Sequence, residues 1–204
     1  MKKTLPLLIL SLLFSFSTFS QGIYLGLEGG AAFPLGKFSA TEDAGAGFAK
    51  IGFQASAYGG YKFSDRLAVG IRTVFSQHMP EGNNSTFVEL NPWNKSSILA
   101  AIKTSQAITK DIYAELEGNV GIMFLEFPAA DIIIGGITIN RESNSGNGLA
   151  FGLGAGIKYY LENNFALRFG LNYVGAEPSY TNSIGEFSQR VDILLLSWGV
   201  LFEI

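Results

Sequence analysis

The sequence predicts an all-β protein, an eight-stranded antiparallel up-and-down β-barrel that spans a membrane. Three observations predict it. Eight segments, each roughly 9–14 residues long, alternate apolar residues with polar or small ones, and a tilted membrane strand needs ~9–11 residues. Short and long connections alternate between these segments. Charged residues make up only 15% of the chain and stay off the apolar faces of the segments.

The first predicted strand illustrates the period of two. Its residues Ile23, Leu25 and Leu27 share one face, and Tyr24 and Glu28 lie on the other. The last segment is apolar on both faces. In chain order the eight predicted strands are 23–33, 51–63, 67–76, 96–108, 112–124, 149–161, 165–173 and 191–204.

The connections predict the orientation of the barrel. Short turns are expected at 64–65, 109–111 and 162–164, and long loops rich in Gly, Ser, Asn and Pro at 34–50, 77–95, 126–147 and 175–190. Outer-membrane barrels have short periplasmic turns and long extracellular loops. An even number of strands then puts both chain ends on the periplasmic side.

Residues 1–20 have the features of a cleaved secretory signal peptide. Lys2 and Lys3 precede an apolar stretch, 5–16, that is short for the ~20 residues of a spanning helix. Thr18 and Ser20 fit the small residues before a cleavage site at Gln21, so that 21–204 is one barrel domain, exported to the cell outer membrane.

Composition excludes several classes of function. The chain has no cysteine, which excludes disulfides, thiolate metal sites and cysteine nucleophiles. A net charge of −3 leaves no basic surface for nucleic acid.

Aromatic residues near the strand ends predict two belts at the membrane interfaces. A soluble lipocalin-like barrel is the alternative fold, and it would turn the apolar face inward and leave a sparsely charged exterior. The belt toward the long loops contains Phe33, Phe53, Phe75, Phe124 and Tyr173, and the belt toward the short turns contains Tyr61, Phe63, Tyr159, Phe165 and Phe202.

The opposite face of the strands carries a balanced set of charges. An eight-stranded barrel is just wide enough for its own side chains, so these charges are expected to pair and to close the lumen. Lys103 is expected opposite Glu115 or Glu117, across the turn at 109–111. The predicted lumen network consists of Glu28, Arg72, Lys103, Glu115, Glu117, Lys158, Arg168 and Glu203.

Glu115 and Glu117 share one face and raise the question of a catalytic or metal site. Nearby bases favour both carboxylates being ionised, whereas an acid/base pair needs separated pKa values. The expected partners are basic rather than further oxygen or imidazole ligands. We therefore expect no catalytic residue, metal or cofactor.

Two loop features have alternative interpretations. His78 lies near Ser76 and Glu81, and outer-membrane lipid A deacylases use these three residue types. The order Ser-Gln-His departs from the His-x-Ser of those enzymes, so a solvated histidine is expected.

The stretch "DIIIGGITI" (131–139) predicts a hairpin with Gly135-Gly136 as its turn. This hairpin either packs on the barrel rim or forms a contact surface for a partner or surface ligand.

Over the whole mature length the chain resembles the small OmpA/OmpX-like outer-membrane β-barrels, also called porin family or outer membrane β-barrel domain proteins. The resemblance rests on "GYKFSDRLAVGIR", "GLGAGIKYYLENNFALRFGLNY" and the terminal "WGVLFEI". It implies that the outer-membrane insertion machinery reads the last strand, at Trp198, Val200, Phe202 and Ile204, where Ile replaces the commoner final Phe.

The expected function is a structural or interaction role at the cell surface: envelope integrity, adhesion or partner contact. A narrow pore or conduit for small solutes or apolar molecules is the alternative, and an outer-membrane component of a secretion system is a further one. We expect a monomer that contacts outer-membrane lipid and is not an enzyme.

Overall fold

The computed structural model describes residues 22–42, 46–81, 88–128, 130–134, 137–141, 143–182 and 185–204. The predicted signal peptide and the predicted Gly135-Gly136 turn lie outside these residues. Among the described residues, no helix has the length and apolar character needed to cross a membrane.

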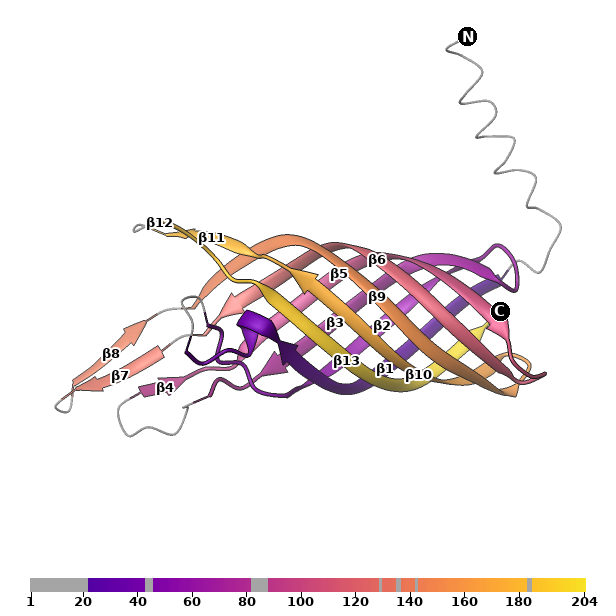
Figure 1. The fold of residues 1–204 in the computed structure, drawn as a ribbon, viewed down its shortest axis with the longest axis horizontal. Helices are drawn as coiled ribbons and strands as arrows, with labels where there is room; N and C mark the ends of the chain where they lie inside the picture. The colour runs from indigo at the N-terminus through magenta and orange to yellow at the C-terminus, as the bar shows by residue number, and fades with distance from the viewer. Residues whose placement is uncertain are drawn as a thin grey trace, which may run out of the picture.

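Eight antiparallel strands close into a barrel, as the sequence predicts (Figure 1). Each pairs with its neighbours in the order β10-β13-β1-β2-β3-β5-β6-β9, and pairing of β9 with β10 closes the ring. The barrel strands are β1 (Gly22–Leu35), β2 (Gly52–Lys62), β3 (Leu67–His78), β5 (Trp93–Ala107), β6 (Ile112–Phe127), β9 (Asn144–Glu162), β10 (Phe165–Ala176) and β13 (Val191–Glu203).

The predicted short turns all lie at one end of the barrel, together with the start of β1 and the end of β13 (Figure 1). Side-chain hydroxyls shape two of these turns, as Ser and Thr commonly do. The Ser64 hydroxyl accepts a hydrogen bond from the Leu67 amide at 3.1 Å, and the Thr109 hydroxyl accepts one from the Ile112 amide, also at 3.1 Å. At the seam, Ile23 and Ile204 exchange two backbone hydrogen bonds of 3.0 and 2.8 Å.

At the opposite end the strands run further than predicted. β5 begins at Trp93 rather than residue 96, and β9 begins at Asn144 rather than residue 149. The ladder between β6 and β9 continues up to the pair Phe127–Asn144. Backbone pairing satisfies the amide and carbonyl groups whatever the side chains are, so Gly, Ser and Asn end the apolar pattern without ending the strand.

Where the structure describes the long loops, they contain further strands and one short helix. The predicted hairpin is confirmed in its pairing: β7 (Ala130–Ile134) pairs with β8 (Ile137–Arg141), and β4 (Val88–Leu90) adds a third strand. This sheet extends away from the barrel (Figure 1). A second hairpin, β11 (Ser179–Asn182) with β12 (Gly185–Ser188), was not predicted. The 3₁₀ helix η1 (Gly36–Phe38) follows β1.

The apolar face of the strands is the outer wall. Leu27, Leu116 and Leu153 are 62%, 61% and 71% exposed, while the residues beside them in sequence point inward. A soluble barrel would bury this face, so the lipocalin-like alternative is wrong. The ten predicted belt aromatics are exposed or half-buried, and some pair on the wall, such as Phe53 with Phe75 and Tyr61 with Phe63.

Candidate functional site

The inward faces of six strands bring seven of the eight predicted lumen charges together in the barrel interior. None of these seven side chains is more than 5% exposed. Such burial is tolerable only when charges are paired and their hydrogen bonds are satisfied. They are Glu28 on β1, Arg72 on β3, Lys103 on β5, Glu115 and Glu117 on β6, Lys158 on β9 and Arg168 on β10.

Arg72 links β3 to both sides of the lumen. Its Nε donates to Glu117 Oε1 at 2.7 Å and its Nη2 to Glu117 Oε2 at 3.0 Å, a bidentate pair. Its Nη1 donates to Glu28 Oε2 at 2.8 Å. Glu28 also accepts from the hydroxyls of Ser56 and Ser197, at 3.3 and 3.2 Å.

Arg168 is fully buried and contacts all three glutamates of the cluster. Its Nε donates to Glu115 Oε2 at 2.6 Å, its Nη1 pairs with Glu28, and its Nη2 lies 3.5 Å from Glu117 Oε2. The planar guanidinium, with five donors in a fixed geometry, suits this three-way contact better than an ammonium would. Arg168 therefore joins strands β1, β6 and β10 across the lumen.

Small residues on the lumen face make room for these long side chains. A Cβ at Gly156 would lie 3.3 Å from Arg168 Nη2, and a Cβ at Gly26 would lie 2.2 Å from the Tyr58 ring. Beside Arg168 and Tyr58 the lumen has little free space, and glycine leaves room for these large side chains.

The two lysines of the cluster lie against tyrosines as well as carboxylates. Lys103 Nζ is 3.3 Å from Glu117 Oε2 and stands 3.9 Å from the centre of the Tyr58 ring and 4.9 Å from that of Tyr24. Aromatic faces attract cations most strongly where water is excluded. The sequence prediction omitted these tyrosines, although both occupy lumen positions of the period-two pattern.

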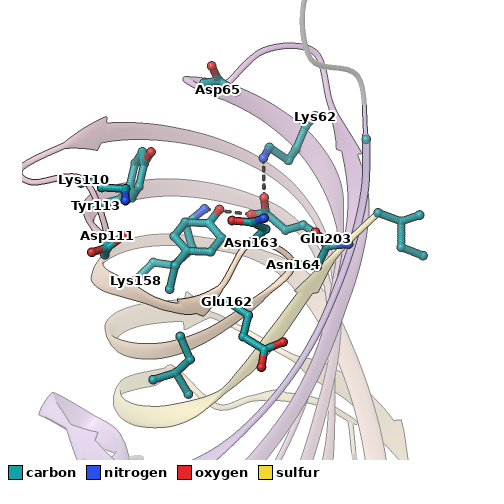
Figure 2. A pocket seen from close by; sticks show the side chains of 14 residues that line it. Lys62, Asp65, Lys110, Asp111, Tyr113, Lys158, Glu162, Asn163, Asn164 and Glu203 are labelled. Atoms are coloured by element: carbon teal, nitrogen blue, oxygen red, sulfur yellow. Dashed lines mark hydrogen bonds and ion pairs between the residues drawn. The ribbon is translucent and has the colours of Figure 1, made fainter.

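Lys158 connects the cluster to the short-turn mouth of the barrel. Its Nζ is 3.6 Å from Glu115 Oε1 and 2.9 Å from Glu203 Oε1, and it lies over the rings of Tyr113 and Tyr160. Glu203, the eighth predicted charge, also pairs with Lys62, which the prediction left out of the network (Figure 2). The signal for Lys62 was present, because it shares the lumen face of β2 with Ser56 and Tyr58.

The short-turn mouth is an open vestibule of about 490 Å³. Lys62, Lys158 and Glu203 form its inner wall, and the three short turns form its rim (Figure 2). The vestibule ends at the charged cluster.

On the long-loop side of the cluster the lumen becomes apolar, which the sequence analysis did not foresee. Phe38 from η1 and Trp93 from β5 cover this layer, with ring centres 5.5 Å apart, and Trp93 Nε1 donates to the Gly47 carbonyl at 2.9 Å. The two-faced apolar pattern of the last strand was the available signal. The layer contains Val74, Leu99, Met123, Leu125, Val174, Ile193 and Leu195.

His78 is buried, so the expectation of a solvated loop histidine is wrong. Its Nδ1 is 2.9 Å from the Lys50 carbonyl oxygen, and the Phe38 ring lies against it edge-on at 5.3 Å. The cause is the extension of β3 to His78 and the folding of the first loop over it. Glu81 is exposed and pairs with Lys50 at 3.7 Å, so it does not complete a Ser-His-Glu arrangement.

The geometry of Glu115 and Glu117 favours ion pairing over chemistry. Each carboxylate contacts at least two bases, and neither lines the vestibule. Among the described residues, no three His, Cys, Asp or Glu side chains gather where they could hold a metal ion.

Residues 7–188 match the family model described as outer membrane protein beta-barrel domain. The chain belongs to this family. Membership places the barrel in an outer membrane, with the apolar wall toward lipid.

Solved structures share the fold of this outer-membrane barrel. Neisserial surface protein A (NspA) has a TM-score of 0.56 at 14% identity, with 91% of this chain and 99% of that chain covered. A major outer membrane protein from Thermus thermophilus has a TM-score of 0.55 at 13% identity, with coverage of 89% and 99%. Outer membrane protein AlkL has a TM-score of 0.52 at 15% identity, with 92% of each chain covered. A comparison with curated proteins finds no match.

Proposed function

We propose that this outer-membrane barrel is a closed, non-enzymatic membrane anchor that acts through its extracellular loops, in envelope integrity, adhesion or partner contact. The observation that carries the proposal is the contact of one buried guanidinium, that of Arg168, with Glu28, Glu115 and Glu117 from two other strands. A solute would have to break these ion pairs to pass, and the apolar layer beyond them adds a second barrier.

The loops support an interaction role. Register places Val88, Ile132 and Ile139 in one row of the sheet β4-β7-β8, and Ile134 beside Ile137. The sheet extends beyond the barrel (Figure 1). Loop strands whose sequence is rich in isoleucine suit contact with another macromolecule.

Conductance across a planar bilayer tests the closed lumen. We expect refolded wild-type protein to give no steady open channel, and Arg168→Ala to conduct, because Ala removes the contact that joins three strands across the lumen. Glu81→Ala, which removes only an exposed ion pair, should behave as wild type. Robust conductance in the wild type would favour the narrow-pore alternative.

Exchange of the β7–β8 hairpin for a short Gly-Ser linker tests the interaction role. Adhesion of cells to host or neighbouring surfaces, or their resistance to detergent, should fall while the barrel still folds and stays closed. Unchanged adhesion and detergent resistance would contradict a role for this hairpin.

Export and assembly form part of the proposal. Cleavage before Gln21 would leave a mature chain that starts next to β1. Trp198, Val200 and Phe202 are exposed along one face of β13, and Ile204, just after it, is exposed as well, so the insertion machinery can contact all four. N-terminal sequencing of protein from outer membranes should begin at Gln21, and Phe202→Ser together with Ile204→Ser should lower the amount assembled there.

A further inference from the structure

Five polar side chains lie close together on the lumen face of β2, β3 and β5, near the apolar layer. Gln54, Ser76 and Lys95 are direct partners across these strands. Ser97 and His78 lie two residues from Lys95 and Ser76, so they share the same face. None of the five is more than 3% exposed.

These side chains hold polar atoms with no hydrogen-bond partner among the residues that the structure describes. They are both amide atoms of Gln54, the hydroxyls of Ser76 and Ser97, Lys95 Nζ and His78 Nε2. Buried polar atoms in folded proteins are nearly always paired with protein, water or a bound ion, because leaving one unpaired is unfavourable. A whole group of them on three neighbouring strands indicates a site for something polar.

Lys95 also lacks a charged partner in the described part of the chain. The lumen carboxylates found there bind other bases. Glu28 and Glu117 bind Arg72 and Arg168, Glu115 binds Arg168 and Lys158, and Glu203 binds Lys62 and Lys158. Lys95 is fully buried and forms no ion pair with any described residue. An isolated ammonium in such surroundings is unfavourable unless an anion compensates it.

We propose that Lys95, Ser76, Ser97 and Gln54 bind one small monovalent anion of the halide class inside the lumen. One lysine compensates one negative charge. The ammonium, the two hydroxyls and the Gln54 amide nitrogen are all donors, which suits a spherical acceptor. Val74 and Leu99, which flank the group on β3 and β5, offer no donors to further oxygens of a larger anion.

His78 differs from the four residues of this site. A carbonyl oxygen only accepts hydrogen bonds, so the Nδ1 atom that faces the Lys50 carbonyl carries the proton. In the neutral ring, Nε2 is then an acceptor. An acceptor does not suit contact with an anion, so His78 is left out of the proposed site.

Anomalous diffraction from crystals of the purified protein in sodium bromide tests the site directly. We expect a bromide peak within hydrogen-bonding reach of Lys95 Nζ and the Ser76 and Ser97 hydroxyls. The peak should vanish in Lys95→Met and remain in Lys50→Met, which removes an exposed lysine. A wild-type lumen with no peak there, or a peak that survives Lys95→Met, overturns the proposal.

Thermal unfolding in solution gives a second readout. Replacing sodium gluconate by sodium bromide at constant ionic strength should raise the wild-type midpoint by roughly 3 °C, because a bound anion stabilises the folded state. Lys95→Met should show no such rise. If this variant does not fold, Ser76→Ala with Ser97→Ala keeps the charge and should reduce the rise. An equal rise in every variant would mean a general salt effect and would contradict the site.

Discussion

Neutralising Glu117 should destabilise the barrel far more than neutralising a surface carboxylate. Glu117→Gln keeps the shape of the side chain but leaves Arg72 and Lys103 facing a neutral amide. In the wild type, Arg72 Nε lies 2.7 Å from Glu117 Oε1, and Lys103 Nζ lies 3.3 Å from Glu117 Oε2. Arg168 loses its 3.5 Å contact as well. Removing one partner from a buried ion pair costs about 3–5 kcal/mol, because the remaining charge is stranded away from water.

That cost corresponds to a fall of roughly 10 °C in the midpoint of thermal unfolding for a protein of this size. Urea unfolding in lipid vesicles, followed by tryptophan fluorescence, measures the free energy directly by linear extrapolation. Trp93 at the long-loop end of the lumen and Trp198 on the outer wall report on two regions of the barrel.

The matched control is Glu81→Gln, which neutralises an exposed ion pair with Lys50. Both side chains are more than half exposed, and such pairs contribute about 0–1 kcal/mol. Adding Lys103→Met to Glu117→Gln should recover part of the stability, because it removes one stranded cation. Equal losses for Glu117→Gln and Glu81→Gln would refute the reasoning that the lumen charges depend on one another.

Three further predictions address the apolar layer of the lumen, the outer wall and the orientation of the barrel in the membrane. Phe38→Ala should lower the free energy of unfolding by about 3–5 kcal/mol, because it leaves a cavity beside Trp93 in the closely packed apolar layer, and urea unfolding measures the loss. Leu116→Arg puts a charge on the lipid face and should cost about 2–4 kcal/mol in vesicles, whereas a stability equal to wild type would place this face away from lipid. Trypsin added to intact cells should cut after the exposed Lys50 but not after the exposed Arg66 until the outer membrane is opened, and early cleavage at Arg66 would reverse the assigned orientation.

The alternation of residues along each strand was sufficient to predict which side chains face lipid and which face the lumen. A barrel strand has only two faces, so one inward residue such as Glu117 assigns Leu116 to the wall and Glu115 to the interior. The same local pattern predicted the short turns, since Ser64 and Thr109 shape them through hydrogen bonds to residues only three positions away. The hairpin of β7 and β8 was predictable for this reason too.

What only the tertiary structure decided is which inward residues meet. The alternation along a strand tells which face each residue lies on, but it does not determine the register between neighbouring strands. The stagger between strands accumulates around the closed ring. Lys103 had two allowed partners on the neighbouring strand, and register selected Glu117. The approach of Arg168 to glutamates from two other strands, the burial of His78 beneath the first loop and the position of Lys95 beside Ser76 all depend on contacts between residues distant in sequence. Such contacts exist only once the barrel is closed and the loops have folded over its long-loop end.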